Sequence, residues 1–270
     1  MTLQGLPRLL RDVAAGQGRI VVLTGAGVSA PSGIPTYRGS DGFWTIGSVN
    51  YRPEELATWD AFSRMPEELW GWYLQRAAAC RKAMPNAAHT AIAAMERTFG
   101  ERFVLITQNI DGLHQRAGNS PQRTWEIHGS LHRLRCTAGC GGPSPLPLDL
   151  TVGAKLDAAT LARLHCKACG EWLRPHVLWF DENYDEENYR FESSLAAVEE
   201  ADLLLVAGTT GATNLPNQLV TLAAARGVPL VVQNLEPSRF SEIAERLPRS
   251  AFVPGDATEQ LPQLARWLGA

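Results

Sequence analysis

Residues 21–39 read VVLTGAGVSAPSGIPTYRG, and this stretch decides the fold. It opens with a run of apolar, mostly β-branched residues, which favours a buried strand. Gly25, Gly27 and Ala30 follow with G-x-G-x-x-A spacing. The first glycine permits a tight turn, the second lets backbone N–H groups approach a pyrophosphate, and the alanine keeps the next helix close. Alone the pattern is weak, because a glycine-rich turn after a strand is about as often only a turn.

Three more apolar runs have the character of strands: RFVLITQ at 102–108, ADLLLVAG at 201–208 and VPLVVQN at 228–234. Amphipathic stretches alternate with them, and this alternation predicts an α/β fold with a Rossmann-like, doubly wound parallel sheet. Pro53 and Pro66 are typical helix starters. The segments predicted to be mostly helical are 53–98, 111–117, 183–199, 214–226 and 257–268.

Two segments interrupt this plan, and they predict a second, smaller domain. Residues 39–101 form a helical module, and residues 131–173 carry two cysteine pairs around the proline-rich link GGPSPLPLDL. We expect both to stand over the carboxyl edge of the sheet, where such folds bind ligands. The Rossmann-like domain, expected to bind the cofactor, would then comprise 1–38, 102–130 and 174–270.

The composition is that of an ordinary globular protein: 270 residues, 45% hydrophobic, with a net charge of −3. This weak charge gives no general attraction for nucleic acid or for an anionic membrane. No apolar run reaches the ~20 residues of a bilayer span, and MTLQGLPRLLRDVAAG lacks the apolar centre of a signal peptide. We therefore expect a cytoplasmic protein with no membrane partner.

Four of the five cysteines fall in two close pairs, Cys136 with Cys140 and Cys166 with Cys169. In a protein that is not secreted, such pairs favour a metal over disulfides. Four thiolates suit one tetrahedral structural Zn²⁺, and a closed site has no position for a catalytic water. The alternative is four thiols without metal. The fifth, Cys80, is expected to be a small core residue.

The acidic residue that usually binds a cofactor ribose is missing from its expected place. It should follow the glycines by about 20 residues, at the end of a second strand. Asp41 lies only 14 residues beyond Gly27, within a glycine-rich loop. Hydride transfer is therefore disfavoured, and a bound cofactor could instead be consumed.

Several motifs in order resemble the sirtuins, the NAD-consuming protein deacylases. They are GAGVSAPSGIPTYR at 25–38, TQNIDGLH at 107–114, HGSLHRLRC at 128–136, the two cysteine pairs and RPHVLWFDE at 174–182. Weaker matches are GTT at 208–210, Asn234-Leu-Glu236 and GDA at 255–257. The resemblance covers nearly the whole chain. It implies a protein lysine deacylase whose products are free lysine, nicotinamide and O-acyl-ADP-ribose, and whose partners are acyl-lysine proteins or peptides.

The resemblance also assigns catalytic roles. His128 is the expected general base, and the near-neutral pKa of histidine suits removal of a ribose hydroxyl proton. From the residues alone, a lone histidine is more often structural. Asn109 and Asp111 follow a predicted strand and are expected to contact the nicotinamide and its ribose; Asp111 can also cap the next helix. The expected cofactor-binding residues are Gly25, Ala26, Gly27, Ala30, Arg38, Gln108, Asn109, Asp111, Gly208, Thr209, Thr210, Asn234, Glu236 and Ala257.

For the acyl-peptide, the resemblance implies contacts from Val177, Phe180 and Glu182. The family usually has glycine where this chain has Asp181, a change that affects the expected peptide pose. Tyr73 and Arg76 share a helix face in LWGWYLQRA. By themselves they predict core packing and a solvated guanidinium. Their Y-x-x-R spacing resembles the sirtuin branch that removes succinyl and malonyl groups, and it implies recognition of a distal carboxylate.

Two other functions remain open from the sequence. The enzyme could transfer ADP-ribose or simply hydrolyse NAD. Alternatively, the zinc ribbon could be a binding module beside a nucleotide-sensing α/β domain. The ribbon is basic, but no aromatic residues interleave its charges for stacking on bases, so we expect no direct nucleic-acid binding. Its basic residues are Arg133, Arg135, Arg163, Lys167 and Arg174.

Overall fold

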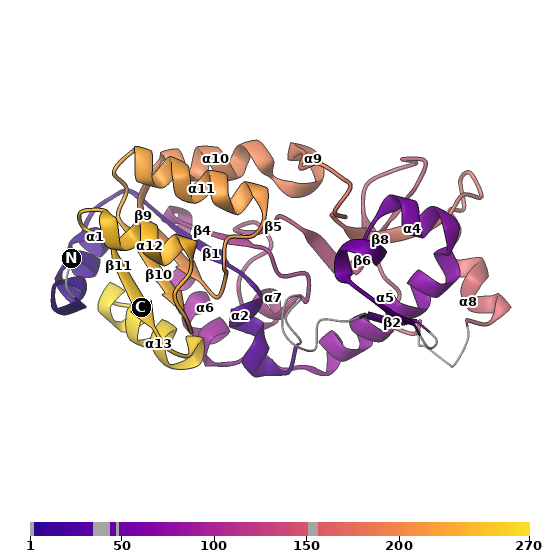
Figure 1. Cartoon of the computed structure of the whole chain (residues 1–270), viewed down its shortest axis with the longest axis horizontal. Helices are drawn as coiled ribbons and strands as arrows, with labels where there is room; N and C mark the ends of the chain where they lie inside the picture. The colour runs from indigo at the N-terminus through magenta and orange to yellow at the C-terminus, as the bar shows by residue number, and fades with distance from the viewer. Residues whose placement is uncertain (1–2, 35–43, 47–48, 151–155) are drawn as a thin grey trace.

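A computed structural model describes residues 3–34, 44–46, 49–150 and 156–270 (Figure 1). Arg38 lies outside the described residues, so its expected contact with the cofactor stays a prediction. In the described part, no helix is both long and apolar enough to cross a membrane.

A six-stranded sheet forms the centre of the larger part of the molecule, in the order β11-β10-β9-β1-β4-β5. Every neighbouring pair is parallel. The order reverses direction between β1 and β9, the arrangement of a Rossmann fold and the point where such sheets bind ligands. The predicted fold class is confirmed. The strands are β1 (Arg19–Thr24), β4 (Phe103–Thr107), β5 (Thr124–Glu126), β9 (Ala201–Ala207), β10 (Leu230–Asn234) and β11 (Ala251–Pro254).

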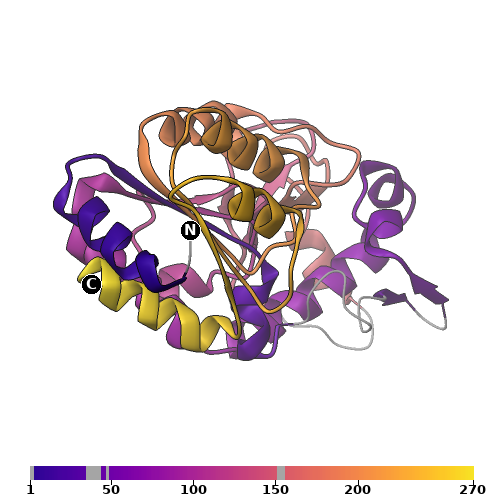
Figure 2. The ribbon, with the colours of Figure 1, turned by 60° about the vertical axis from the view of Figure 1, so that its left-hand side comes forward.

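Helices cover both faces of this sheet, as Figure 2 shows for the yellow α13 on one side and the orange α11 on the other. Ile20 and Val22 of β1 face the first layer, and Val21 and Leu23 face the second. Successive side chains of a strand point to opposite faces, which explains why a strand covered on both faces is apolar throughout. The first layer comprises α1 (Leu6–Ala15), α6 (Ala87–Phe99) and α13 (Ala257–Leu268), and the second α10 (Phe191–Glu199), α11 (Asn214–Ala225) and α12 (Arg239–Arg246).

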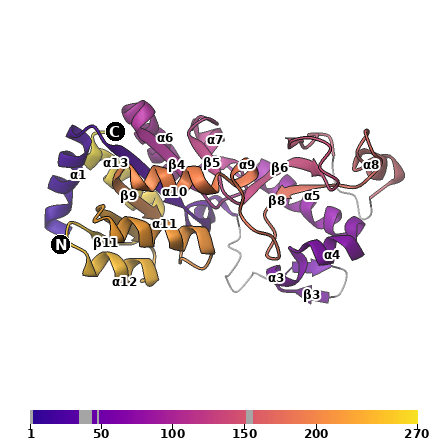
Figure 3. The ribbon, with the colours of Figure 1, turned by 90° about the horizontal axis from the view of Figure 1, so that it is seen from above.

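A smaller module stands beyond the carboxyl ends of the strands (Figures 1 and 3). Its buried cluster joins Leu69, Trp70 and Leu74 to Leu131 and Leu134 of the antiparallel sheet. The helical segment and the cysteine-bearing ribbon therefore share one core. The module comprises α3 (Pro53–Leu56), α4 (Trp59–Arg64), α5 (Pro66–Lys82), α8 (Ala158–Arg163), the pair β2 (Trp44–Ile46) with β3 (Val49–Tyr51), and the sheet of β7 (Ser144–Pro145), β6 (Gly129–Cys136) and β8 (Leu173–Val177).

The position of α6 corrects the domain boundary expected at residue 101. This helix buries Ala88, Ile92 and Met95 in the cluster that lines the sheet, together with residues of α1 and α13. Its apolar stripe matches the sheet, so α6 packs with the larger part, and the boundary moves to the loop before Ala87. Within the small module, α3 and α5 begin at Pro53 and Pro66 as predicted.

Candidate active site

Two glycine-containing loops meet at the point where the strand order reverses. The N–H of Gly25 donates to the Ala207 carbonyl at 3.0 Å, and the N–H of Gly27 donates to the Gly208 carbonyl at 2.9 Å. A Cβ at Gly27 would lie 2.8 Å from the Gly208 Cα. Gly208 itself has a φ of +63°. Gly27 and Gly208 are thus required because the backbones of the two loops approach so closely, whether or not a pyrophosphate is bound.

Short helical turns continue from this contact. The helix α2 (Ala26–Ser29) starts directly after Gly25 and passes into a 3₁₀ turn, Ala30–Ser32. The N–H of Ala30 donates to the Ala26 carbonyl. This confirms the predicted strand, turn and helix at the carboxyl edge of the sheet. The N–H groups of Gly27 and Val28 donate to the carbonyls of Gly208 and Gly25, so neither is offered to an anion in this structure.

Gln108 connects the loops after three strands. Its Nε2 donates to the Thr209 hydroxyl at 3.0 Å and to the Thr24 carbonyl at 3.2 Å. Its Oε1 accepts from the Thr213 hydroxyl at 3.1 Å. The side-chain amide therefore fixes the relative positions of β1, β4 and the loop after β9.

Asn109 and Asp111, the next polar residues, are both buried. Asn109 Nδ2 donates to the Gly25 carbonyl at 3.1 Å and to the Ser29 hydroxyl at 3.0 Å. Asp111 Oδ1 accepts from the N–H of Leu113 at 2.8 Å, at the start of α7 (Leu113–Ala117). Asp111 thus satisfies the first N–H of α7, although the N-cap position itself is Gly112.

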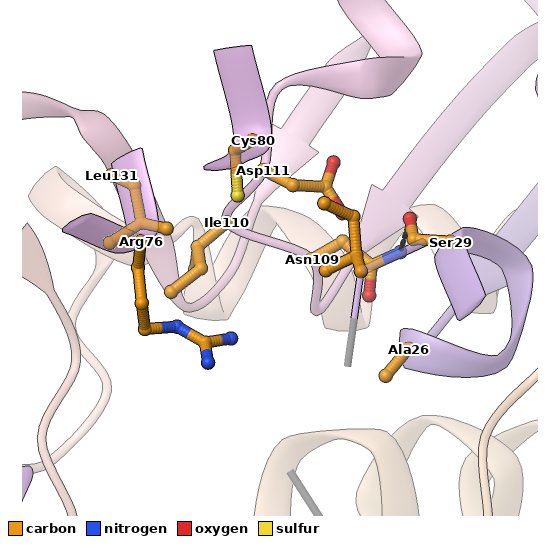
Figure 4. Close-up of a pocket in the computed structure, with 9 residues that line it drawn as sticks. Ala26, Ser29, Arg76, Cys80, Asn109, Ile110, Asp111 and Leu131 are labelled. Atoms are coloured by element: carbon orange, nitrogen blue, oxygen red, sulfur yellow. Dashed lines mark hydrogen bonds between the residues drawn. The ribbon is translucent and has the colours of Figure 1, made fainter. Parts of the chain in front are cut away.

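A small cavity brings together the two regions that the sequence associates with NAD and with the acyl group. Asn109 and Asp111 line it from the sheet side, and Arg76 lines it from α5 (Figure 4). The remaining lining residues are Ala26, Ser29, Ile34, Cys80, Ile110 and Leu131. A ligand in this cavity would contact an amide, a carboxylate and a guanidinium.

His128 lies between β5 and β6, and both of its ring nitrogens make hydrogen bonds. Nδ1 lies 3.1 Å from the Gln108 carbonyl oxygen, and Nε2 lies 2.8 Å from the Tyr184 hydroxyl. A carbonyl can only accept, so Nδ1 carries the hydrogen and Nε2 presents its lone pair. Burial lowers the pKa of His128 to about 4, although the hydrogen bond to the Gln108 carbonyl opposes this shift. The imidazole is therefore neutral at pH 7, as a general base must be.

Tyr73 and Arg76 project from α5 toward the small module's core and the cavity. Tyr73 is 2% exposed, and its hydroxyl accepts from Trp179 Nε1 at 2.7 Å. The guanidinium of Arg76 lies 4.9 Å from the ring centroid of Trp72, which is itself edge-on to Tyr73 at 4.8 Å. The packing expected for Tyr73 is present, whereas Arg76 lines the cavity.

The residues expected near the adenosine differ in exposure. Asn234 is buried and donates to the Thr209 carbonyl at 2.8 Å and to the Ser238 hydroxyl at 3.2 Å. Thr210 and Glu236 are exposed, and Ala257 is buried at the start of α13. Asn234 thus supports the loop, while Thr210 and Glu236 are the side chains accessible to a nucleoside.

The residues expected to bind the peptide follow β8. Val177 is buried, whereas Phe180 is 49% exposed. The Glu182 carboxylate accepts from the guanidinium of Arg174 and from that of Arg135. It also accepts from the backbone N–H of Trp179 at 2.9 Å. Glu182 therefore shapes the turn that presents Phe180.

Asp181 contributes to the N-terminal end of α4. Its two carboxylate oxygens accept from the N–H groups of Trp59 at 2.9 Å and Asp60 at 3.3 Å. These are N–H groups of the first helical turn, which have no partner within the helix. The acid at the usual glycine position thus attaches the loop after β8 to the small module.

Replacing Asp181 with glycine is expected to destabilise the protein by about 0.5–2 kcal/mol, because two N–H groups lose an anionic cap. For a chain of this size that corresponds to a fall in Tm of roughly 1–8 °C. Thermal unfolding followed by circular dichroism would measure it. Asp181→Asn retains an acceptor oxygen and serves as the control; equal losses in both variants would contradict the capping role.

The four paired cysteines converge on one point of the small module. Their Sγ atoms all lie within 4.8 Å of one another, and those of Cys136 and Cys169 are 3.6 Å apart. Thiolates around a tetrahedral zinc lie about 3.8 Å apart, so the set fits the ion. None of the four forms a disulfide. The cluster would hold a closed structural Zn²⁺ that ties β6 to the loop before β8.

Cys140→Ser is expected to lower bound zinc from about one ion per chain to nearly none and to lower Tm, because zinc binding supplies folding free energy. Mass spectrometry of metal content and thermal unfolding would measure both effects. Cys80→Ala is the matched control, since Cys80 is buried outside this cluster. Full zinc content in Cys140→Ser would argue against four-cysteine ligation.

Two residues of the site were missed from the sequence. Ser29 accepts from Asn109 and contacts His89 Nε2 at 3.3 Å. Tyr184 contacts His128 although the two residues are 56 positions apart. No local pattern marks Tyr184, because most of its neighbours in DENYDEENY are polar. Ser29 could have been found as a polar residue in the turn after the glycines.

The chain matches known proteins over almost its whole length. The sequence profile of the Sir2 family matches residues 25–214. A curated relative from Leptospira interrogans, named NAD-dependent protein deacylase, is 39% identical over 248 residues, 92% of each chain. The solved complex of a Sir2 homologue with NAD has a TM-score of 0.79 and 36% identity, covering 97% of this chain and 93% of that one. A complex of Sir2 with a p53 peptide and NAD⁺ has a TM-score of 0.78 and 27% identity, covering 100% and 99%.

Proposed function

Because this chain belongs to the Sir2 family, we propose that it is an NAD-dependent protein lysine deacylase that removes succinyl and malonyl groups in preference to acetyl groups. NAD is consumed as a co-substrate, and the substrates are proteins or peptides that carry an acyl-lysine. The names of the curated relatives and the peptide complex of a structural neighbour support the reaction class.

The reaction joins two substrates at the carboxyl edge of the sheet. The amide oxygen of the acyl-lysine attacks C1′ of the nicotinamide ribose, and nicotinamide leaves. Asn109 and Asp111 orient the nicotinamide and its ribose. The adenosine end lies along the loops after β9 and β10, where Thr210 and Glu236 are exposed.

His128 acts in the second half of the reaction. Its neutral Nε2 takes the proton of a ribose hydroxyl, and that hydroxyl oxygen then captures the acyl carbon. The Gln108 carbonyl, which accepts from Nδ1, keeps the imidazole in the tautomer that this step requires. It also stabilises the imidazolium that forms.

The acyl preference rests on one observation: Arg76 lines the same cavity as Asn109 and Asp111 (Figure 4). An acyl chain that reaches the ribose from this cavity passes the guanidinium. A succinyl or malonyl carboxylate can form a charge-assisted, potentially bidentate pair with Arg76. Tyr73 lies one turn earlier on α5, and its hydroxyl accepts from Trp179 Nε1.

The test uses one peptide sequence that carries acetyl-, malonyl-, succinyl- or glutaryl-lysine. Each peptide is incubated with the zinc-loaded enzyme and NAD, and nicotinamide and O-acyl-ADP-ribose are followed by mass spectrometry. We expect equal amounts of the two products and the highest kcat/KM for succinyl or malonyl peptides. Loss of NAD without an O-acyl product would instead indicate NAD hydrolysis or ADP-ribosyl transfer.

A further inference from the structure

The loop after β8 places a tyrosine hydroxyl on the nitrogen that is the proposed base. Tyr184 Oη lies 2.8 Å from His128 Nε2, and the ring centroids are 5.9 Å apart at an interplanar angle of 38°. Because the Gln108 carbonyl fixes the hydrogen on Nδ1, Nε2 accepts and the phenol donates. In this state the lone pair of the base is already occupied.

The tyrosine is held in place by its own surroundings. Its ring stacks on Phe191 at 6.3 Å and meets Tyr189 edge-on at 6.5 Å. Burial raises the pKa of Tyr184 to about 12, although a side-chain hydrogen bond with Thr213 opposes the shift. The phenol is therefore protonated at neutral pH and is available as a donor.

We propose that Tyr184 is a positioning residue that occupies Nε2 of His128 in the free enzyme and gives it up to a ribose hydroxyl when NAD and the acyl-lysine bind. The imidazole Nε2 has one lone pair, so the phenol and the ribose hydroxyl compete for it. In this exchange one O–H···N hydrogen bond breaks and another forms, and no proton is transferred. The inference rests on the proposed role of His128 in deacylation.

The competition makes two effects measurable. A donor on Nε2 stabilises the neutral imidazole, so its removal must raise the pKa of His128. Removal of this donor also frees Nε2 for the ribose hydroxyl. NAD should therefore bind more tightly. Burial lowers the pKa of His128 and the hydrogen bond to the Gln108 carbonyl opposes this, and among the described residues no charged side chain contributes.

Tyr184→Phe keeps the ring and removes the donor. In the free enzyme, an NMR titration of the His128 ring should show a pKa higher by about 0.5–1 unit, the size expected for one neutral hydrogen bond. The apparent pKa of the acidic limb in the pH profile of kcat/KM should rise by a similar amount. At saturating acyl-peptide, KM for NAD should fall roughly 2- to 10-fold while kcat changes by less than about 2-fold.

Tyr189→Phe is the matched control five residues later, at the end of the helix α9 (Glu186–Tyr189). The hydroxyl of Tyr189 is buried and has no hydrogen-bond partner among the described residues. Its removal should leave the His128 pKa, the pH profile and KM unchanged. The control separates the loss of the Tyr184 donor from a general loosening of the loop.

The outcomes separate this inference from the proposed function. An unchanged His128 pKa in Tyr184→Phe would overturn the inference whatever the activity, since the NMR titration needs no substrate. A raised pKa with an unchanged KM for NAD would overturn the displacement. If the unaltered enzyme forms no O-acyl-ADP-ribose, the proposed function fails, and a shift of the His128 pKa would still confirm the hydrogen bond itself.

Discussion

Replacing His128 with alanine is expected to lower the rate of O-acyl-ADP-ribose formation by about 10²- to 10⁴-fold, the usual contribution of a general base. The neutral imidazole is held between the Gln108 carbonyl and the Tyr184 hydroxyl, and Nε2 presents the lone pair that takes the ribose proton. Without it, water must accept this proton. Quenched-flow assays with acyl-peptide and NAD, analysed by mass spectrometry, would measure the loss.

A second readout tests where in the reaction His128 acts. Attack on C1′ and departure of nicotinamide precede the proton transfer, so exchange of labelled nicotinamide into NAD should persist in His128→Ala when acyl-peptide is present. Thermal unfolding and calorimetric binding of NAD control for the fold and for co-substrate affinity. If exchange fell as far as product formation in a folded variant that binds NAD, the assignment of His128 to the later step would be wrong.

Replacing Arg76 with methionine is expected to lower kcat/KM for succinyl-peptides by about 30- to 1,000-fold, the cost of truncating one partner of a buried, hydrogen-bonded charge pair. Methionine retains much of the aliphatic stem that packs along α5, so the loss would reflect the guanidinium. Deacetylation should change by less than about 3-fold, because an acetyl group has no distal carboxylate to bind. Parallel assays on acetyl- and succinyl-peptides of one sequence would measure the ratio.

Arg81→Met provides the matched control on the same helix. Arg81 donates to the carbonyls of Leu148 and Pro147 and does not line the cavity with Arg76. It should leave the ratio of desuccinylation to deacetylation unchanged. Equal losses on both substrates in Arg76→Met would instead assign Arg76 to packing and refute its role in acyl selection.

The expectations that held were those based on local chemistry. Alternating apolar runs predicted the sheet and most of its helices, since a strand covered on both faces must be apolar throughout. The spacing of the cysteine pairs predicted four thiols in one cluster. Helix α1 was missed although Leu6, Leu9, Leu10 and Val13 follow helical periodicity and are buried.

Other roles depended on contacts between residues that lie far apart in the sequence. Gly27 is constrained by the backbone of Gly208, which no reading of the loop alone could show. Asp181, expected to affect the peptide pose, caps a helix 122 residues earlier in the chain. The helix α6 was expected in the inserted module, but it packs against the central sheet, because its apolar stripe is buried there.

The sequence by itself therefore determined the α/β class, the cysteine cluster and the family. Each of these depends on residue types that recur within short motifs. Only the tertiary structure decided that Arg76 faces the same cavity as Asn109 and that Tyr184 occupies the lone pair of His128. These contacts join separate elements, since Arg76 lies on α5, His128 follows β5 and Tyr184 follows β8. Sequence periodicity specifies how each element folds, but the packing of elements against one another sets which loop side chains meet.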